Sequence, residues 1–117
     1  MAYYNSQYIE ITGTVTGYVA ECADPSTLRL FARFDVKIEK FKRMKGAMHP
    51  RDVQRVVAGG RLGAYAADTL KDGDRIMVSG EIQNGRYGAL VDANKIILLE
   101  RLNNVRIPEE GTQISLL

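Results

Sequence analysis

Residues 28–41 alternate between apolar and polar positions, which predicts one β-strand with two different faces. Side chains point alternately to the two faces of a strand. One face is wholly apolar and is expected in a core; it carries Leu28, Leu30, Ala32, Phe34, Val36 and Ile38. The other face places cations between aromatic rings, in the order Arg29, Phe31, Arg33, Asp35, Lys37, Glu39 and Phe41.

Cations and exposed rings on one strand face are typical of a surface that binds single-stranded nucleic acid. The cations follow the phosphates while the flat rings stack on bases. The alternative is that Phe31 and Phe41 contact a neighbouring subunit or lie under a loop. The pattern of this strand is compatible with both interpretations.

Four more strands are predicted by the pattern, at residues 8–19, 52–58, 75–82 and 89–99. In the first of them, Gly13 and Gly17 occupy the apolar register, where a strongly curved strand of a small barrel often needs glycine. The strand at 52–58 has no clean alternation, which favours a strand covered on both faces. Asn84-Gly85 predicts a two-residue hairpin turn, and residues 92–94 predict a bulge or bend in the last strand.

Between residues 60 and 73 the period changes from two to about 3.6, which predicts one short helix with a glycine stop. Its apolar stripe consists of Leu62, Tyr65, Ala66, Thr69 and Leu70. The order is three strands, one helix and two strands, the plan of the oligonucleotide/oligosaccharide-binding (OB) fold. We therefore expect an all-β domain over residues 1–101, a five-stranded Greek-key barrel with one short helix between strands three and four, and a short C-terminal tail over 102–117.

The charge of the chain is unevenly distributed, although the net charge is only +2. Residues 37–51 hold one acid, Glu39, and six basic residues, which gives this segment a charge of +5 and leaves −3 for the rest. A charge run is usually a solvated loop. Here it directly follows the strand face that carries cations and rings, which favours a continuous binding path.

Residue types that catalysis or metal binding would need are scarce. His49 is the only histidine and Cys22 the only cysteine, so a structural zinc site is not expected, and neither is an intramolecular disulfide. Asp72 and Asp74 flank Gly73, which is typical of a helix stop and not of an acid/base pair. We expect no enzyme, no cofactor and no metal. The N-terminus has no signal-peptide pattern and no segment is apolar enough to span a membrane, so a soluble, cytoplasmic protein is expected.

Three segments, residues 31–38, 53–83 and 89–101, resemble the bacterial and phage single-stranded DNA-binding proteins. The specific part is the middle one, where residues 55–57, 60–62, 70–74 and 78–80 match the family pattern without a gap. The resemblance implies an OB fold and non-catalytic binding of single-stranded DNA with little sequence preference, in replication, recombination or repair. It also implies a homo-oligomer, dimer or tetramer, with replication or repair proteins as possible partners.

The chain departs from that family at three places. Val53 and Gly59 stand where the family usually has aromatic residues, and the hairpin near Asn84-Gly85 is short. The acidic tail is missing, since residues 102–117 hold only two acids and end in Ile-Ser-Leu-Leu. The two lost aromatics and the Ile-Ser-Leu-Leu end favour an alternative, a primosome-type or scaffold OB-fold protein that acts mainly through protein contacts.

Candidate binding residues follow from the strand faces, the basic segment and the resemblance. Stacking on bases is predicted for Phe31, Phe41, Tyr8, Tyr18 and Tyr87. Contacts with phosphates are predicted for Arg29, Arg33, Lys37, Lys40, Lys42, Arg43, Lys45, Arg55 and Arg61. We further expect that Phe31 and Phe41, on the same face of one strand, replace the stacking lost at Val53 and Gly59.

Overall fold

Five long strands and one helix follow each other in the order that the sequence predicts. The computed structural model describes residues 7–85, 88–101 and 113–114. Its elements are β1 (Tyr8–Ala23), β2 (Leu30–Arg43), β3 (Val53–Gly59), α1 (Gly60–Thr69), β4 (Arg75–Gly85), β5 (Gly88–Glu100) and the two-residue strand β6 (Gln113–Ile114). The predicted helix between the third and fourth strands is confirmed.

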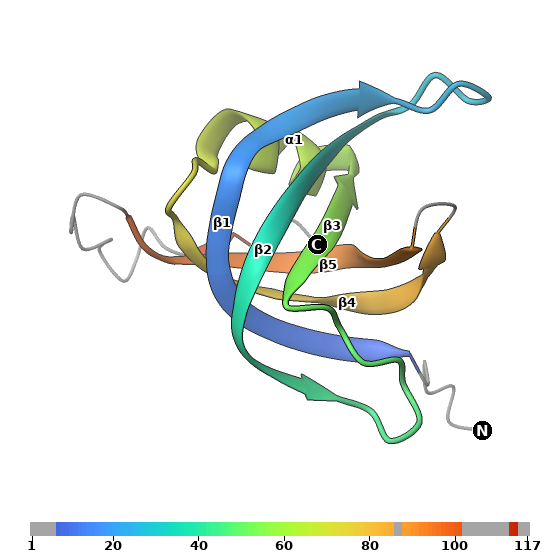
Figure 1. Ribbon diagram of the computed structural model, residues 1–117. Helices are drawn as coiled ribbons and strands as arrows, with labels where there is room; N and C mark the ends of the chain where they lie inside the picture. Colours follow the sequence, from blue (N-terminus) through green and yellow to red (C-terminus); the bar gives the residue numbers. More distant parts are fainter. Residues whose placement is uncertain (1–6, 86–87, 102–112, 115–117) are drawn as a thin grey trace.

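The strands close into a barrel because β1 takes part in both halves of the sheet. The order is β3-β2-β1-β4-β5-β6, and a parallel pairing of β3 with β5 joins the two sides. In Figure 1, β1 bends strongly around the molecule, β2 and β3 lie in front, β4 and β5 cross behind them, and α1 lies near the upper end of the barrel. This is the five-stranded OB barrel that the sequence predicts.

The core fills the space between the two halves of the sheet. Ala32, Phe34 and Val36 of β2 are buried, which confirms the apolar face predicted for the middle of that strand. Helix α1 adds Leu62 and Ala66, followed by Leu70. The remaining strands supply Ile9, Ile11, Val15, Val56, Ala58, Ile76, Val78, Ile82, Val91, Ala93, Ile96 and Leu98.

Two glycines of β1 have distinct roles. Gly13 is buried, and a Cβ atom there would overlap the carbonyl oxygen of Lys37 on β2, so the close approach of the strands requires glycine. Gly17 has a φ of +83° and begins a bulge in which β1 has three residues between Thr16 and Ala20. Beyond the bulge β1 pairs with β2 again, so β1 continues to Ala23 and is longer than predicted.

The buried amide of Gln54 ties three segments together where the barrel closes. Its Oε1 accepts a hydrogen bond from the backbone N–H of Arg51 at 2.9 Å. Its Nε2 donates to the carbonyl oxygens of Arg55 at 3.0 Å and of Ala89, in β5, at 2.9 Å. Because a buried polar group is costly without partners, these bonds hold the loop before β3 and the parallel β3–β5 pair in one arrangement.

Strand β3 differs from its prediction as a strand covered on both faces. Gln54, Val56 and Ala58 are buried, whereas Val53 and Arg55 are exposed. The strand therefore alternates cleanly, but with a polar amide inside and valine outside. Because of this inversion, the hydrophobicity of the sequence does not reveal the alternation of buried and exposed residues in β3.

Leu28 and Leu30 were predicted in the core and are exposed, by 77% and 60%. The ends of β1 and β2 project beyond the rest of the barrel (Figure 1). A residue that belongs to the apolar face by alternation is therefore not buried at this end. The turn between them is held by Asp24, whose Oδ1 accepts bonds from Ser26 and Thr27. Leu28 has a φ of +61°, an uncommon conformation for a residue with a side chain.

The β4–β5 hairpin turns two residues later than predicted. Asn84 and Gly85 still pair with Ala89 and Gly88, and Gly88 takes a φ of +116°. The connecting residues 86 and 87 lie outside the described part of the chain. The bulge predicted at 92–94 is confirmed, because the register shifts there while β5 continues.

We predict that Gln54→Leu lowers the free energy of unfolding by about 2–4 kcal/mol, because three backbone groups lose the amide as a partner. Urea unfolding followed by circular dichroism measures this loss. Gln83→Leu, at an exposed position of β4, is the matched control and should change stability by less than about 0.5 kcal/mol. Equal stability of the Gln54 variant and the wild type would contradict the role of the amide in closure.

Candidate nucleic-acid interface

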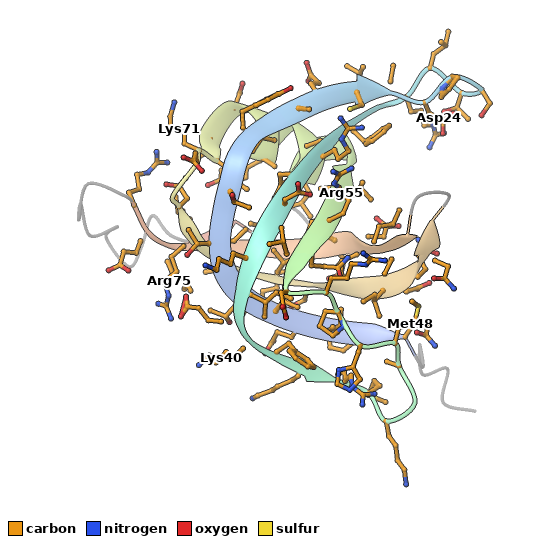
Figure 2. The ribbon with its side chains drawn as sticks, viewed as in Figure 1. Asp24, Lys40, Met48, Arg55, Lys71 and Arg75 are labelled. Carbon is orange, nitrogen blue, oxygen red and sulfur yellow. The ribbon has the colours of Figure 1, made fainter. Side chains whose placement is uncertain are left out.

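A groove runs over the outer face of the barrel where β2, β3 and the start of β5 meet. Its volume is about 440 Å³. Arg55, labelled in Figure 2, lies on the face where β2 and β3 run side by side. The groove is lined by Phe31, Arg33, Asp35, Arg51, Val53, Arg55, Val57, Gly88, Ala89 and Leu90.

The cations of the groove differ in their ion-pair partners. The Nε of Arg55 donates a hydrogen bond to Oδ1 of Asp35 at 2.6 Å, directly across the β2–β3 ladder. This carboxylate raises the pKa of Arg55 above its ordinary value. Arg33 and Arg51 form no ion pair with any residue that the structure describes, so their charges face the groove without a carboxylate.

The apolar wall of the groove combines one ring with aliphatic side chains. Phe31 lies directly opposite Gly59, and since Gly59 has no side chain, nothing on β3 covers the ring at that position. Val53, Val57 and Leu90 complete the wall. The position predicted to lack a stacking ring at Gly59 is therefore next to Phe31, as expected if this ring replaces it.

A second, smaller hollow lies on the other side of the Arg55–Asp35 pair. It has a volume of about 190 Å³ and shares Arg33, Asp35 and Arg55 with the groove. Tyr18 lines it from β1 and is 82% exposed, because it lies in the bulge that begins at Gly17. We call this the Tyr18 hollow. The two depressions lie side by side across β1, β2 and β3, and Arg33, Asp35 and Arg55 line both of them.

Phe41 does not share a strand face with Phe31, which corrects the sequence prediction. The register between β1 and β2 shifts at Glu39, so that Phe41 pairs with Ile11 and faces the side that carries the core residues. At this end of the barrel the ring is exposed and contacts His49 edge to face, with centroids 5.6 Å apart. The extra residue of a bulge exchanges the faces of all residues beyond it.

The other candidate residues are spread over the molecule. Lys37 is exposed on the same face as Arg33 and lies opposite Val53. Arg29 lines a depression of about 420 Å³ beside Phe31, next to the first turn of α1. Tyr8 is exposed at the start of β1, and Tyr87 lies outside the described residues. Exposed positions away from the groove are taken by Lys40, Lys42, Lys45 and Arg61.

The basic segment is partly used to build its own loop. Arg43 is half-buried; it donates to the carbonyl oxygen of Ala47 at 2.7 Å and lies 2.9 Å from Nε2 of His49. Its guanidinium is thus engaged within the chain. Lys40, in Figure 2, lies at the opposite end of β2 from the turn that holds Asp24, so it is remote from the Tyr18 hollow.

Arg51, Val57 and Leu90 are groove residues that the sequence prediction did not include. Arg51 was counted only as part of the charge run, yet it also lines a hollow beside Phe41 and so connects that hollow to the groove. Val57 and Leu90 are apolar and half-buried, so nothing in their residue type distinguishes them from core positions. The outward valines of β3 could have been recognised only if Gln54 had been assigned to the core.

Two acids limit the groove on the β4–β5 side. Glu81 and Asp92 are directly paired across these strands, and Asp92 lies beside Val57. Partial desolvation of its carboxyl, and to a lesser degree the charge of Glu81, raise the pKa of Asp92, although the residue is exposed. Both acids lie on the side of β3 that is away from β2.

We predict that Asp92→Asn stabilises the protein at neutral pH and not in acid. The folded state binds the proton of Asp92 more tightly than the unfolded state does. The wild-type protein therefore loses folding stability as the pH rises from the ordinary pKa of this carboxyl through its raised pKa. The difference in unfolding free energy between variant and wild type, measured in urea at pH 3.5 and pH 7, should grow with pH. A difference that is constant or shrinks would contradict the raised pKa.

Helix α1 is the only helix in the described part of the chain, and its ten residues fall well short of a membrane span. No protein-family model and no curated protein matches the sequence. Several solved structures have a similar fold.

The second single-stranded DNA-binding protein of Mycobacterium smegmatis superposes with a TM-score of 0.60 at 16% identity, covering 78% of this chain and 86% of that one. The single-stranded DNA-binding protein of Thermus aquaticus superposes with a TM-score of 0.62 at 20% identity. The superposition covers 81% of this chain but only 41% of that one. A mitochondrial single-stranded DNA-binding protein of S. cerevisiae superposes with a TM-score of 0.62 at 12% identity, over 86% of this chain and 99% of that one. The chain therefore has the OB fold in the form found in these single-stranded DNA-binding proteins.

Proposed function

We propose that this protein binds single-stranded DNA with little sequence preference and without catalysis. The observation that carries the proposal is the groove over β2, β3 and β5, where Arg33 and Arg51, which have no carboxylate partner among the described residues, lie beside the half-buried ring of Phe31. In the OB fold, the face of strands two and three is the common site for oligonucleotides. The proteins of similar fold, which are named for binding single-stranded DNA, support the same function.

The chemistry of the groove favours single strands over duplex. Its wall of Phe31, Val53, Val57 and Leu90 offers contact to the flat faces of bases, which a duplex keeps stacked inside the helix. Its cations offer contact to the phosphate backbone, which carries no sequence information. We infer that affinity combines base contact with charge and discriminates poorly between sequences.

We further propose a role in DNA replication, recombination or repair inside the cytoplasm, with the protein acting as a homo-oligomer. Exposed Leu28 and Leu30, at the projecting end of the β1–β2 hairpin, support self-association. The alternative, a scaffold protein that acts through protein contacts, is supported by β6, which adds to the edge of β5 at Ile96 and Ile97. That edge is able to accept an added strand.

Oligo-dT should bind more tightly than duplex DNA of equal length, and its affinity should fall with salt. Fluorescence anisotropy at several salt concentrations measures both.

Arg33→Ala combined with Arg51→Ala should reduce the log–log salt slope by about 1.4, since each phosphate contact on a single strand contributes about 0.7. Lys71→Ala combined with Lys95→Ala removes the same charge outside the groove and is the control. No binding of oligo-dT by the wild type would favour the scaffold alternative.

Self-association is tested by light scattering coupled to size exclusion at micromolar concentration. The expected result is a mass of twice the 13.0 kDa of one chain or more. Leu28→Asp combined with Leu30→Asp should shift the mass toward that of a single chain, because charges replace exposed apolar side chains. A monomeric wild type would contradict the proposed oligomer while leaving DNA binding to be judged by the titration.

A further inference from the structure

The ion pair of Arg55 with Asp35 occupies the middle of the proposed DNA path. Both residues line the groove on one side and the Tyr18 hollow on the other. The pair links neighbouring positions of β2 and β3 and, together with Arg33, lines both depressions. A strand that lies in both depressions has to pass over these side chains.

We propose that Arg55, held in place by Asp35, is a platform on which a nucleobase stacks, and that it is not a phosphate ligand. This inference rests on the proposed binding of single-stranded DNA and assigns a base-stacking role to a cation that the sequence analysis expected at a phosphate. Asp35 is then a positioning residue, which acts on the DNA through Arg55.

The charges around Arg55 disfavour a phosphate. The carboxylate of Asp35 lies 2.6 Å from the guanidinium and already balances its positive charge. A phosphate at the same guanidinium would approach this carboxylate and be repelled by it. Arg33 and Arg51, which have no such neighbour in the described structure, are the better phosphate ligands of the same groove.

The geometry of the pair leaves the guanidinium available for stacking. Asp35 is bonded to Nε alone, and neither Nη atom has a partner among the residues that the structure describes. The Arg55 side chain keeps 46% of its surface exposed. A guanidinium is planar and weakly hydrated, and bases stack on such planes in complexes with single strands. A fixed plane loses less conformational entropy on stacking than a free side chain.

The surroundings of the pair also favour a base. Val53 and Val57, on either side of Arg55 in β3, line the groove together with Leu90. Phosphate oxygens gain nothing from these aliphatic walls, whereas a base buries apolar surface against them. Arg55 thus supplies a flat surface in a groove where Phe31 is the only lining ring among the described residues.

A second ion pair of the chain serves as a matched control. Arg75 is bonded to Glu39 through Nε at 2.7 Å, with similar exposure of both side chains. Like Asp35, Glu39 belongs to β2, but Arg75 comes from β4 and lines neither the groove nor the Tyr18 hollow. In Figure 2, Arg75 lies well apart from Arg55.

The test measures oligo-dT affinity by anisotropy for Asp35→Ala, Asp35→Asn and Glu39→Ala, after circular dichroism has shown that each variant is folded. If Asp35 positions the platform, Asp35→Ala should weaken binding at least about 3-fold, although it removes a negative charge from the DNA path. Asp35→Asn keeps an oxygen that accepts from Nε and should restore at least the wild-type affinity. Glu39→Ala should bind as tightly as the wild type or slightly more tightly.

Tighter binding by both Asp35→Ala and Asp35→Asn would overturn the inference, because it would mean that Asp35 only repels DNA. In that case the wild type still binds and the proposed function stands. A wild type that does not bind oligo-dT overturns the proposed function, and the inference with it. The two failures are therefore distinguishable.

Arg55→Lys provides a second test that does not depend on Asp35. It keeps the charge but not the plane, so we expect affinity to fall about 5- to 150-fold, the effect of one lost base stack, with an unchanged salt slope. Arg75→Lys is the control and should leave affinity unchanged. Retained affinity in Arg55→Lys would assign Arg55 to a phosphate and overturn the inference.

Discussion

The groove exists because β3 and β5 pair at the point where the barrel closes. Its residues come from β2, β3 and β5, which are distant in the sequence and become neighbours only through this parallel ladder. Gln54 supports the ladder from inside by bonding both strands and the backbone of Arg51. A buried amide in this position also determines which side chains of β3 point outward. Core and groove thus depend on the same residue.

The surface that results is less aromatic than a typical single-strand binding face. Phe31 is the only ring that lines the groove in the described part of the chain, and aliphatic side chains occupy the rest of its wall. Base–aromatic stacking is worth about 1–3 kcal/mol per base, so a face with few rings has to draw on charge, on aliphatic contact and on guanidinium planes. The close pairing of Arg55 with Asp35 fits such a face, because it orders a planar cation while limiting its attraction to phosphate.

Bulges decide which residues reach this surface. The bulge at Gly17 exposes Tyr18 beside the Arg55–Asp35 pair, and the register shift at Glu39 turns Phe41 away from Phe31. The single extra residue at Glu39 changes the face of every position that follows in β2, whereas the two extra residues of the Gly17 bulge leave the alternation of β1 unchanged. The strong curvature of β1, which pairs with both β2 and β4, is the reason that the barrel needs such irregularities.

The periodicity of the sequence was enough to predict the element order, the middle of the core and the outward positions of Phe31, Arg33 and Asp35, because alternation is a local property of a strand. The other features depend on how distant segments pack together. Exposure of Leu28 and Leu30 depends on how far the β1–β2 hairpin projects beyond the barrel, and the face of Phe41 depends on a register shift between paired strands. The partnership of Arg55 with Asp35 and the place of Arg51 and Leu90 in the groove depend on which strands become neighbours. These are relations between distant segments, and no periodicity within one segment contains them.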